Sequence, residues 1–145
     1  MLRSERGFTL IEALVSLLIL SIVSLISFNF VLNLHDYIQL NHVLTVFQAD
    51  LHHARDFNMI QLNDAERMMI RIYHQENRYV ILVGDVMQDE RQLPDQIVIP
   101  HQNVTSHISF NERGNLGVGR TFIFSSRYHE RSVVFSVGAG GFDVR

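Results

Sequence analysis

A long apolar tract near the N-terminus constrains this chain more than any other feature of its sequence. Residues 8–34 read FTLIEALVSLLILSIVSLISFNFVLNL and contain one charged side chain, Glu12. As an α-helix, this tract would be roughly 40 Å long, because each residue adds about 1.5 Å. A helix of that length is sufficient to cross a hydrocarbon core of about 30 Å. We therefore expect residues 8–34 to form one membrane-spanning helix.

The flanks of the tract predict its orientation. Arg3 and Arg6 precede it, and no basic residue follows it closely. Cytoplasmic flanks carry the excess of Lys and Arg, so we expect the N-terminus in the cytoplasm and the rest of the chain outside. A secretory signal peptide would have a shorter apolar region, of about 7–15 residues, followed by a small-residue cleavage site. Here the tract is longer and the small residue, Gly7, precedes it, which argues against a signal peptide.

The residue types that are absent exclude several kinds of site. The chain has 145 residues, a formal net charge of −3 and no Cys, and all 12 of its basic residues are Arg. Disulfides, thiolate metal sites, a P-loop Lys and a Schiff base are therefore excluded. His52 and Asp56 are four residues apart, but no third metal ligand follows at a useful spacing. We expect no enzyme activity, no cofactor and no metal site.

Glu12 is unusual because a carboxylate within an apolar helix costs a few kcal/mol on insertion scales. One interpretation places its side chain among the lipid headgroups, since it lies near the start of the tract. The other pairs it with a cation. No basic side chain lies nearby in the helix, so the cation would be an amine made by cutting after Gly7, in this chain or in a neighbour.

A second pattern in the tract is a stripe of small residues. Ser21, Ser24 and Ser27 recur every three residues. Such stripes allow membrane helices to approach each other closely. The same hydroxyls can instead bond to carbonyls of the preceding helical turn. The sequence leaves both interpretations open.

Helical periodicity continues to residue 62, where turn-like residues end it. Apolar residues recur at intervals of three to five, with polar residues such as Asp36 and Asp50 between them, as on an amphipathic helix. The apolar positions are Leu34, Ile38, Val43, Val46, Phe47, Leu51, Ala54 and Phe57. We expect one helix over residues 8–62, whose second half, residues 35–62, packs against a head.

Residues 63–145 change to a strand-like pattern. Large apolar residues alternate in segments such as 108–110 and 122–124, as in sheets that pack one face on a helix. The expected strands are 68–73, 79–83, 97–99, 104–110, 121–125, 133–137 and 142–144. Asp85, Asp89 and Glu90 are expected in a solvated loop. The fold class is therefore α+β, one long helix packed on an antiparallel β-sheet head.

The sequence GFTLIE at residues 7–12 resembles the class III signal of type IV pilins and pseudopilins. The resemblance implies that a prepilin peptidase cuts after Gly7 and N-methylates Phe8. It also implies that Glu12 meets a neighbour's N-terminal amine while the helices assemble with other pseudopilins. An assembly ATPase and a membrane platform protein would act indirectly. The implied organisation is a leader (1–7), a transmembrane half-helix (8–34), an amphipathic half-helix (35–62) and a head (63–145).

The head narrows the resemblance. Residues 110–115 and 133–141 are similar to the C-terminal half of GspH/FimT-type minor pseudopilins. Residues 78–79 and 83–85, with the overall length, are most like ComGD-type competence pseudopilins. This likeness implies a cell-surface filament for DNA uptake. One alternative is a pseudopilin of type II secretion or a type IV pilus, and another is a single-span receptor with a ligand-binding head.

The number and position of basic residues in the head determine whether we expect it to bind DNA directly. Some relatives use basic residues in the final Gly-rich turn to touch DNA, but here the turn reads GGFD at residues 140–143. The head carries nine Arg against ten acidic residues. Contacts to phosphate need several cations on one surface. We expect at most weak, non-specific binding of duplex DNA, with Arg127, Arg131 and Arg145 as the candidate contacts.

Overall fold

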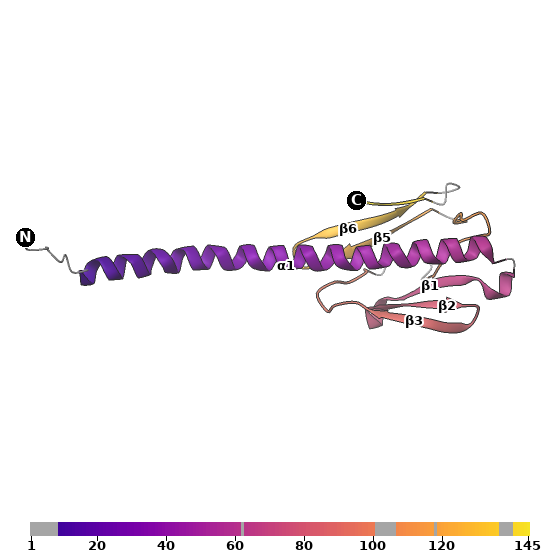
Figure 1. The fold of residues 1–145 in the computed structure, drawn as a ribbon, viewed down its shortest axis with the longest axis horizontal. Helices are drawn as coiled ribbons and strands as arrows, with labels where there is room; N and C mark the ends of the chain where they lie inside the picture. The colour runs from indigo at the N-terminus through magenta and orange to yellow at the C-terminus, as the bar shows by residue number, and fades with distance from the viewer. Residues whose placement is uncertain (1–8, 62, 101–106, 118, 137–140) are drawn as a thin grey trace, which may run out of the picture. The chain divides into compact units, whose positions relative to one another are not determined.

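The computed structural model describes residues 9–61, 63–100, 107–117, 119–136 and 141–145. The chain divides into two compact units, Met1–His35 and Asp36–Arg145, which we call unit 1 and unit 2. Figure 1 shows one helix, α1 (Leu10–Ile60), running through both units. Neither Pro nor Gly occurs between residues 10 and 60, so nothing in the backbone chemistry interrupts it. The expected long helix is confirmed, although residues 8 and 62 lie outside the described part.

The first sheet of unit 2 is antiparallel and has the strand order β3-β2-β1-β4. β1 and β2 form a hairpin in which Met68 pairs with Val83 and Tyr73 with Arg78. A short 3-10 helix closes this hairpin, and another precedes β1. The bounds are η1 (Asp64–Glu66), β1 (Met68–Tyr73), η2 (His74–Glu76), β2 (Arg78–Val83), β3 (Val86–Gln92) and β4 (His107–Ser109).

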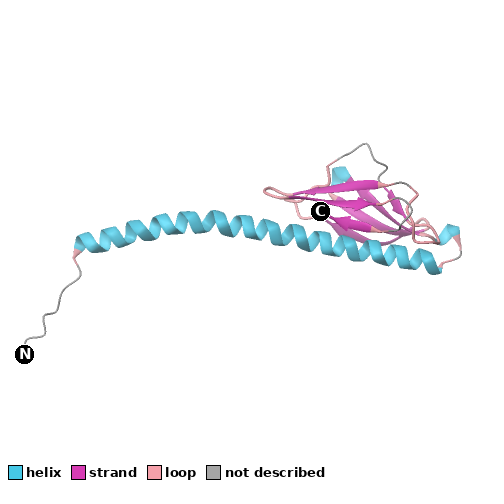
Figure 2. Ribbon diagram, turned by 90° about the horizontal axis from the view of Figure 1, so that it is seen from above, coloured by secondary structure: helices cyan, strands magenta, loops and turns pink. Residues whose placement is uncertain are grey.

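The second sheet is also antiparallel, with the order β5-β6-β7. Its strands are β5 (Arg120–Ser125), β6 (Glu130–Phe135) and β7 (Phe142–Val144). Outside the named strands, Val98 forms a bridge with Ser125. Figure 2 shows the strands of both sheets beside the second half of α1.

One apolar core joins α1 to both sheets. Phe47 is completely buried, and its ring lies 5.2 Å from that of Tyr79 on β2 and 5.0 Å from that of Phe124 on β5. The core also includes Leu40, Leu51, Ile70, Ile108, Phe122, Val133 and Phe135. The α+β class is confirmed, as is the packing of alternating apolar strand residues on the helix.

Three expectations are corrected. Asp89 and Glu90, expected in a loop, lie in β3, an edge strand that is exposed along nearly all its length. A strand with polar residues on both faces carries no alternating pattern to recognise. The segment expected as a strand at residues 97–99 is reduced to the bridge at Val98. Asp36 and Asp50, expected on a solvated helix face, are 3% and 9% exposed.

Candidate functional site

The start of α1 is organised by Thr9. Its Oγ1 accepts a hydrogen bond from the backbone N–H of Glu12 at 3.3 Å, and its carbonyl oxygen accepts one from Ala13 at 3.1 Å. Thr9 is therefore the N-cap, and Glu12 is the third helical residue, whose backbone N–H it caps; the Thr-x-x-Glu sequence is that of a capping box, but only the bond from the Glu12 N–H is formed. An acidic residue at this position is also favoured by the helix dipole. Sequence reasoning missed this role, although the Thr-x-x-Glu pattern was available.

Of the predicted processing and assembly residues, the structure describes Glu12 alone, because Gly7 and Phe8 lie outside the described residues. Glu12 is exposed, and its carboxylate forms no hydrogen bond or ion pair with the part of the chain that is described. Its charge is therefore available to a group outside the described residues.

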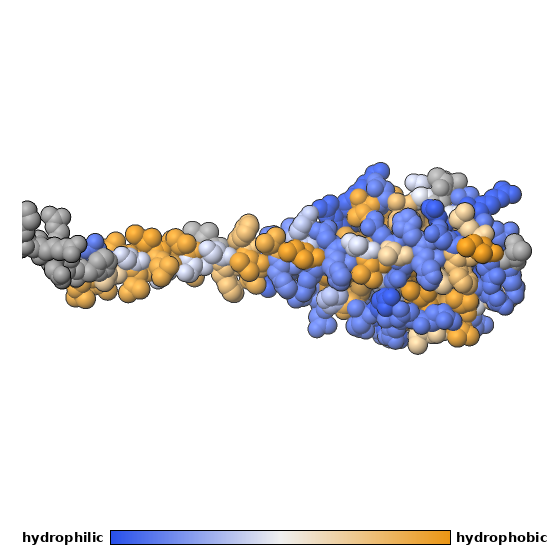
Figure 3. Space-filling model, viewed as in Figure 1, coloured by the Kyte–Doolittle hydropathy of each residue, from blue (hydrophilic) through white to orange (hydrophobic). Residues whose placement is uncertain are grey.

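Unit 1 leaves its apolar side chains uncovered. Leu10 is 80% exposed, Leu25 71% and Phe30 69%. Among the described side chains of residues 10–35, none is buried. Figure 3 shows this surface as a nearly continuous apolar stretch along the first half of α1. Within the described chain, α1 is the one helix long and apolar enough to cross a membrane. Such a surface requires lipid or other protein to cover it.

The serine stripe in unit 1 bonds to its own helix. The hydroxyls of Ser21, Ser24 and Ser27 donate to the carbonyls four residues earlier, each at 2.8 Å. The local-bonding interpretation is therefore realised in the structure. Close packing against another helix stays a prediction. The local bonds do not conflict with it, because a serine bonded to its own helix is still a small residue that lets another helix approach.

The predicted basic residues do not converge on one surface. Arg127 lies in the turn between β5 and β6. Ser132 pairs with Arg145 through two backbone hydrogen bonds of 2.8 and 2.9 Å, so Arg145 shares the face of Ser132. Arg131 lies on the opposite face, that of buried Val133, because side chains alternate along a strand. The guanidinium of Arg145 also approaches Asp143 at 3.3 Å.

The turn that carries Arg127 is attached to α1 by a buried carboxylate. Oδ2 of Asp36 accepts hydrogen bonds from Oγ of Ser126 at 2.6 Å and from the backbone N–H of Tyr128 at 3.2 Å. The ring of Tyr37 contacts that of His129 edge to face, with centroids 5.5 Å apart. Asp36 therefore holds residues 126–129 against the first turn of the part of α1 that belongs to unit 2.

A second buried carboxylate joins α1 to the first sheet. The Tyr79 hydroxyl donates to Oδ2 of Asp50 at 2.7 Å, and Nε of Arg91 lies 3.5 Å from the same oxygen. Burial, followed by the hydrogen bond to the Asp50 carboxylate, raises the pKa of Tyr79 well above its usual range. The hydroxyl is thus kept protonated as a hydrogen-bond donor, which makes the arrangement structural.

Asn58 is the third buried polar residue of the helix, and it is completely buried. Its amide group donates to the carbonyls of Met68 and Phe110 at 2.8 and 3.0 Å, and its carbonyl oxygen accepts from the N–H of Met68 at 2.7 Å. One side chain therefore ties the end of α1 to β1 and to the residue after β4. Nothing in the sequence distinguishes Asn58 from the exposed Asn residues of the helix.

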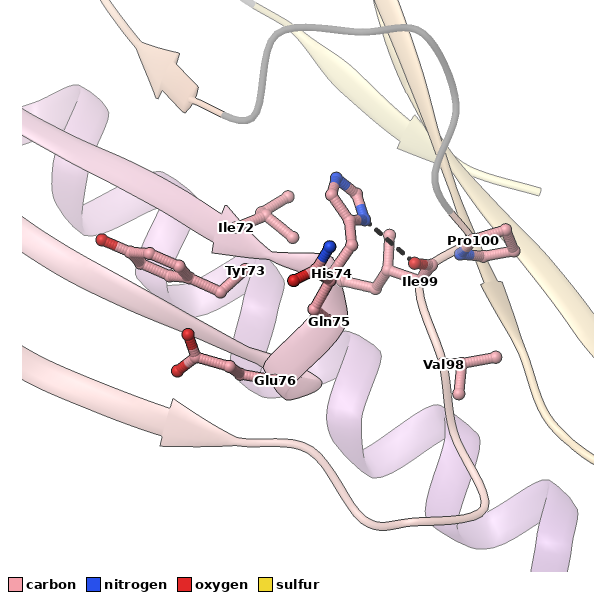
Figure 4. A pocket seen from close by; sticks show the side chains of 8 residues that line it. All are labelled: Ile72, Tyr73, His74, Gln75, Glu76, Val98, Ile99 and Pro100. Atoms are coloured by element: carbon pink, nitrogen blue, oxygen red, sulfur yellow. Dashed lines mark hydrogen bonds between the residues drawn. The ribbon is translucent and has the colours of Figure 1, made fainter.

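An open pocket of about 590 Å³ lies beside η2. Figure 4 shows that Nδ1 of His74 is bonded to the carbonyl oxygen of Ile99, at 3.0 Å. Glu76, which also lines it, is paired with Arg78. Its lining residues are Ile72, Tyr73, His74, Gln75, Glu76, Val98, Ile99 and Pro100. His74 and Glu76, two of the titratable side chains that could act as a general acid or base, are thus engaged in contacts within the fold.

The described residues contain no cluster of potential metal ligands: no group of three or more His, Asp or Glu side chains among them is placed to hold an ion. The His52 ring packs against Phe142 at 4.6 Å between centroids. Asp56 faces Arg55, with 3.7 Å between Oδ1 and Nε. The weak pair noted in the sequence therefore takes part in packing and a surface ion pair.

Comparison with known proteins gives a match for one segment of the chain, at its N-terminal end. Residues 2–28 match the family model described as the prokaryotic N-terminal methylation motif. No curated protein and no solved structure gives a significant match to the chain. The matched segment includes GFTLIE and the first part of α1, and this motif indicates a type IV pilin-like protein that is processed by a prepilin peptidase and assembles with other pilins.

Proposed function

We propose that this type IV pilin-like chain is a minor pseudopilin of a competence pseudopilus, required for DNA uptake. The prepilin peptidase cuts after Gly7 and methylates Phe8, and the subunit then assembles through α1. It is a structural subunit and not an enzyme. The observation that carries the proposal is the methylation motif at residues 2–28, which includes the start of a helix whose apolar side chains are uncovered in unit 1. The competence role rests on the resemblance of the head segments.

Glu12 supports assembly as the purpose of that helix. Its carboxylate has no partner among the described residues, and a charge taken into an apolar bundle is tolerated only when it is paired. Cutting after Gly7 creates a terminal amine on Phe8, four residues before Glu12. An amine of a neighbouring subunit supplies the missing cation, so processing and assembly are linked through one ion pair.

The processing step is tested with Gly7→Val. A peptidase that recognises a bond at the membrane face leaves little room for a side chain, so we expect the full-length precursor to accumulate in the membrane. Gly117→Val is the matched control, because a Cβ added at Gly117 meets no atom within 4 Å. Normal processing of Gly7→Val on a gel would contradict the proposal.

The assembly step is tested with two variants of Glu12. Glu12→Leu should be cleaved normally but incorporated poorly into filaments, because breaking a buried ion pair from one side costs about 3–5 kcal/mol. Glu12→Gln removes the charge and keeps both the backbone N–H that Thr9 caps and a side chain that suits this helix position. Poor incorporation of both variants supports the ion pair. Normal incorporation of Glu12→Gln would assign Glu12 to helix capping instead.

Direct DNA binding is proposed to be weak. Arg127, Arg131 and Arg145 are the candidate contacts, and Arg145 lies on a different face from Arg131 and beside Asp143. Titration of the chain in detergent against labelled duplex at physiological salt should show only salt-sensitive, non-specific binding. Micromolar or tighter binding that disappears in Arg127→Gln with Arg131→Gln would make the subunit a DNA receptor.

The filament's task is tested by deletion. Loss of this gene should lower transformation frequency and leave protein secretion unchanged, and the wild-type chain should restore transformation where Gly7→Val does not. A secretion defect would favour the type II pseudopilus, and a loss of surface pili would favour a type IV pilus. A single-span receptor, to which the pocket beside η2 would be suited, would keep residues 1–7 and function unprocessed.

A further inference from the structure

The turn at residues 126–129 is held close to the end of the apolar tract. It is bonded to Asp36, which follows the last apolar residue, Leu34, by two positions within the continuous helix α1. Two residues of helix add about 3 Å. Both hydrogen bonds belong to unit 2, so the turn stays with Asp36 wherever that residue is placed.

The position of Asp36 relative to a bilayer follows from the charge pattern of the helix. Residues 13–34 contain no charged side chain, and as a helix they are about 33 Å long. This length matches a hydrocarbon core of about 30 Å. With Glu12 at the inner surface before assembly, Asp36 lies in the outer headgroup layer, which is about 6 Å thick.

The side chains around Asp36 are of the kinds that occupy this layer. Tyr37 and Tyr128 are 40% and 45% exposed, so each shows an aromatic ring with a polar end to its surroundings. Tyr and Trp are enriched where membranes meet water. The guanidinium of Arg127 lies 5.4 Å from the centre of the Tyr128 ring. An exposed Arg beside an aromatic ring can extend along it and reach a phosphate.

The local charge balance leaves Arg127 as the exposed cation of the turn. The Asp36 carboxylate is buried and accepts two hydrogen bonds. Glu130 precedes Arg131 in the sequence and carries the opposite charge. Its Oε2 accepts a hydrogen bond from the Ser125 hydroxyl at 3.4 Å. The turn therefore presents one guanidinium beside the ring of Tyr128.

We propose that residues 126–129, together with Tyr37, form a membrane-contacting surface that lies in the headgroup layer while the subunit is stored in the bilayer. Tyr128 and Tyr37 insert among the headgroups, and Arg127 binds the phosphate of an anionic phospholipid. Asp36 is the positioning residue that keeps the turn at the membrane. The proposal rests on the proposed function in one respect, namely that α1 spans the membrane.

The absence of Trp from the sequence makes a direct test available. The full chain with Tyr128→Trp is reconstituted into vesicles of phosphatidylcholine with phosphatidylglycerol that contain a lipid with a nitroxide on its headgroup. We expect strong quenching of the Trp at position 128. Val86→Trp is the matched control, because Val86 is 64% exposed at the start of β3. The emission of a Trp at position 86 should not change when the nitroxide lipid is present.

Charge and position are tested in the same system. Adding Arg127→Gln should lower the equilibrium ratio of chains whose turn contacts lipid to chains whose turn is in water. The expected decrease is about fivefold in anionic vesicles, because one Arg near an anionic surface changes binding by about that factor. In pure phosphatidylcholine the ratio should change little. Adding Asp36→Ala should abolish quenching, whereas Asp36→Asn, which keeps an acceptor oxygen, should retain it.

Insertion is measured separately by resistance to carbonate extraction, so that the two proposals fail in different ways. A chain that is not inserted overturns the proposed function and this inference together. An inserted chain whose Trp at position 128 is quenched no more than that at position 86 overturns the inference alone. A response of position 128 to duplex DNA, with none to the quencher lipid, would also overturn it.

Discussion

The two halves of α1 have the same backbone conformation and opposite relations to their surroundings. In unit 1, no described side chain is buried, and the serine hydroxyls bond only to carbonyls one turn away. In unit 2, the same helix buries Phe47 in a core shared with two sheets, and Asp36, Asp50 and Asn58 bond to distant segments. The first half therefore depends on lipid or neighbouring subunits, whereas the second contributes to a core of its own.

The largest expected difference between the halves is that between two Phe residues. Phe47→Ala removes a completely buried ring and should destabilise unit 2 by about 3–5 kcal/mol. Phe30→Ala removes a ring that is 69% exposed in unit 1 and should leave the unfolding of unit 2 unchanged. Urea unfolding of the chain in mild detergent, followed by near-UV circular dichroism, compares the two. Equal effects would contradict the division into units.

A pair of Asn residues gives the next largest contrast. Asn58→Ala leaves the N–H and carbonyl of Met68 and the carbonyl of Phe110 without this partner, which should cost about 3 kcal/mol. Asn41→Ala, on the same helix, removes a bond to the Tyr37 carbonyl four residues earlier and should change stability by less than about 0.5 kcal/mol. The same denaturation experiment measures both, and a small effect of Asn58→Ala would mean that water replaces the amide.

A smaller effect is expected at high pH from Tyr79. Its pKa is raised in the folded chain, so the folded state holds the proton more tightly than the unfolded state, whose Tyr titrates near pH 10. Stability is therefore retained below about pH 10 and falls above it, by up to about 1.4 kcal/mol per pH unit.

Tyr79→Phe should cost about 1–2 kcal/mol at neutral pH, because the bond to Asp50 is lost. The variant should also remove the part of the alkaline decline that Tyr79 causes. Unfolding curves collected from pH 8 to pH 11.5 test both statements. An unchanged alkaline decline in Tyr79→Phe would assign it to other groups.

The smallest effect is expected in unit 1. Ser24→Ala removes a hydroxyl that bonds only to the Leu20 carbonyl, so unit 2 should unfold as before, within about 0.5 kcal/mol. Ser24→Leu distinguishes the two interpretations of the stripe. If small residues allow close packing of helices, this variant should be processed normally but incorporated less into filaments. Normal incorporation would leave the stripe with local bonding alone.

The parts of the structure that were predictable are those with strong periodic signals. β1 and β7 were predicted with the bounds observed, and β2 and β5 differ from prediction by one residue at the start. β3 was missed because an exposed edge strand needs no apolar alternation. The burial of Asp36, Asp50 and Asn58 was not predictable, because a polar residue on an amphipathic helix is ordinarily solvated. Their partners, among them Ser126, Tyr79 and Phe110, are brought near only by the complete fold.

The three buried polar attachments also determine how α1 responds to tension. In a helix, the hydrogen bonds run along the axis and are loaded in series, so a pull can break them one turn at a time. The attachments at Asp36, Asp50 and Asn58 join the helix sideways to the β5–β6 turn, to β2 and to β1. A pull along α1 loads them in parallel, together with the apolar core. The extensible part of the subunit is therefore the helix of residues 10–35, and unit 2 keeps its shape while that segment lengthens.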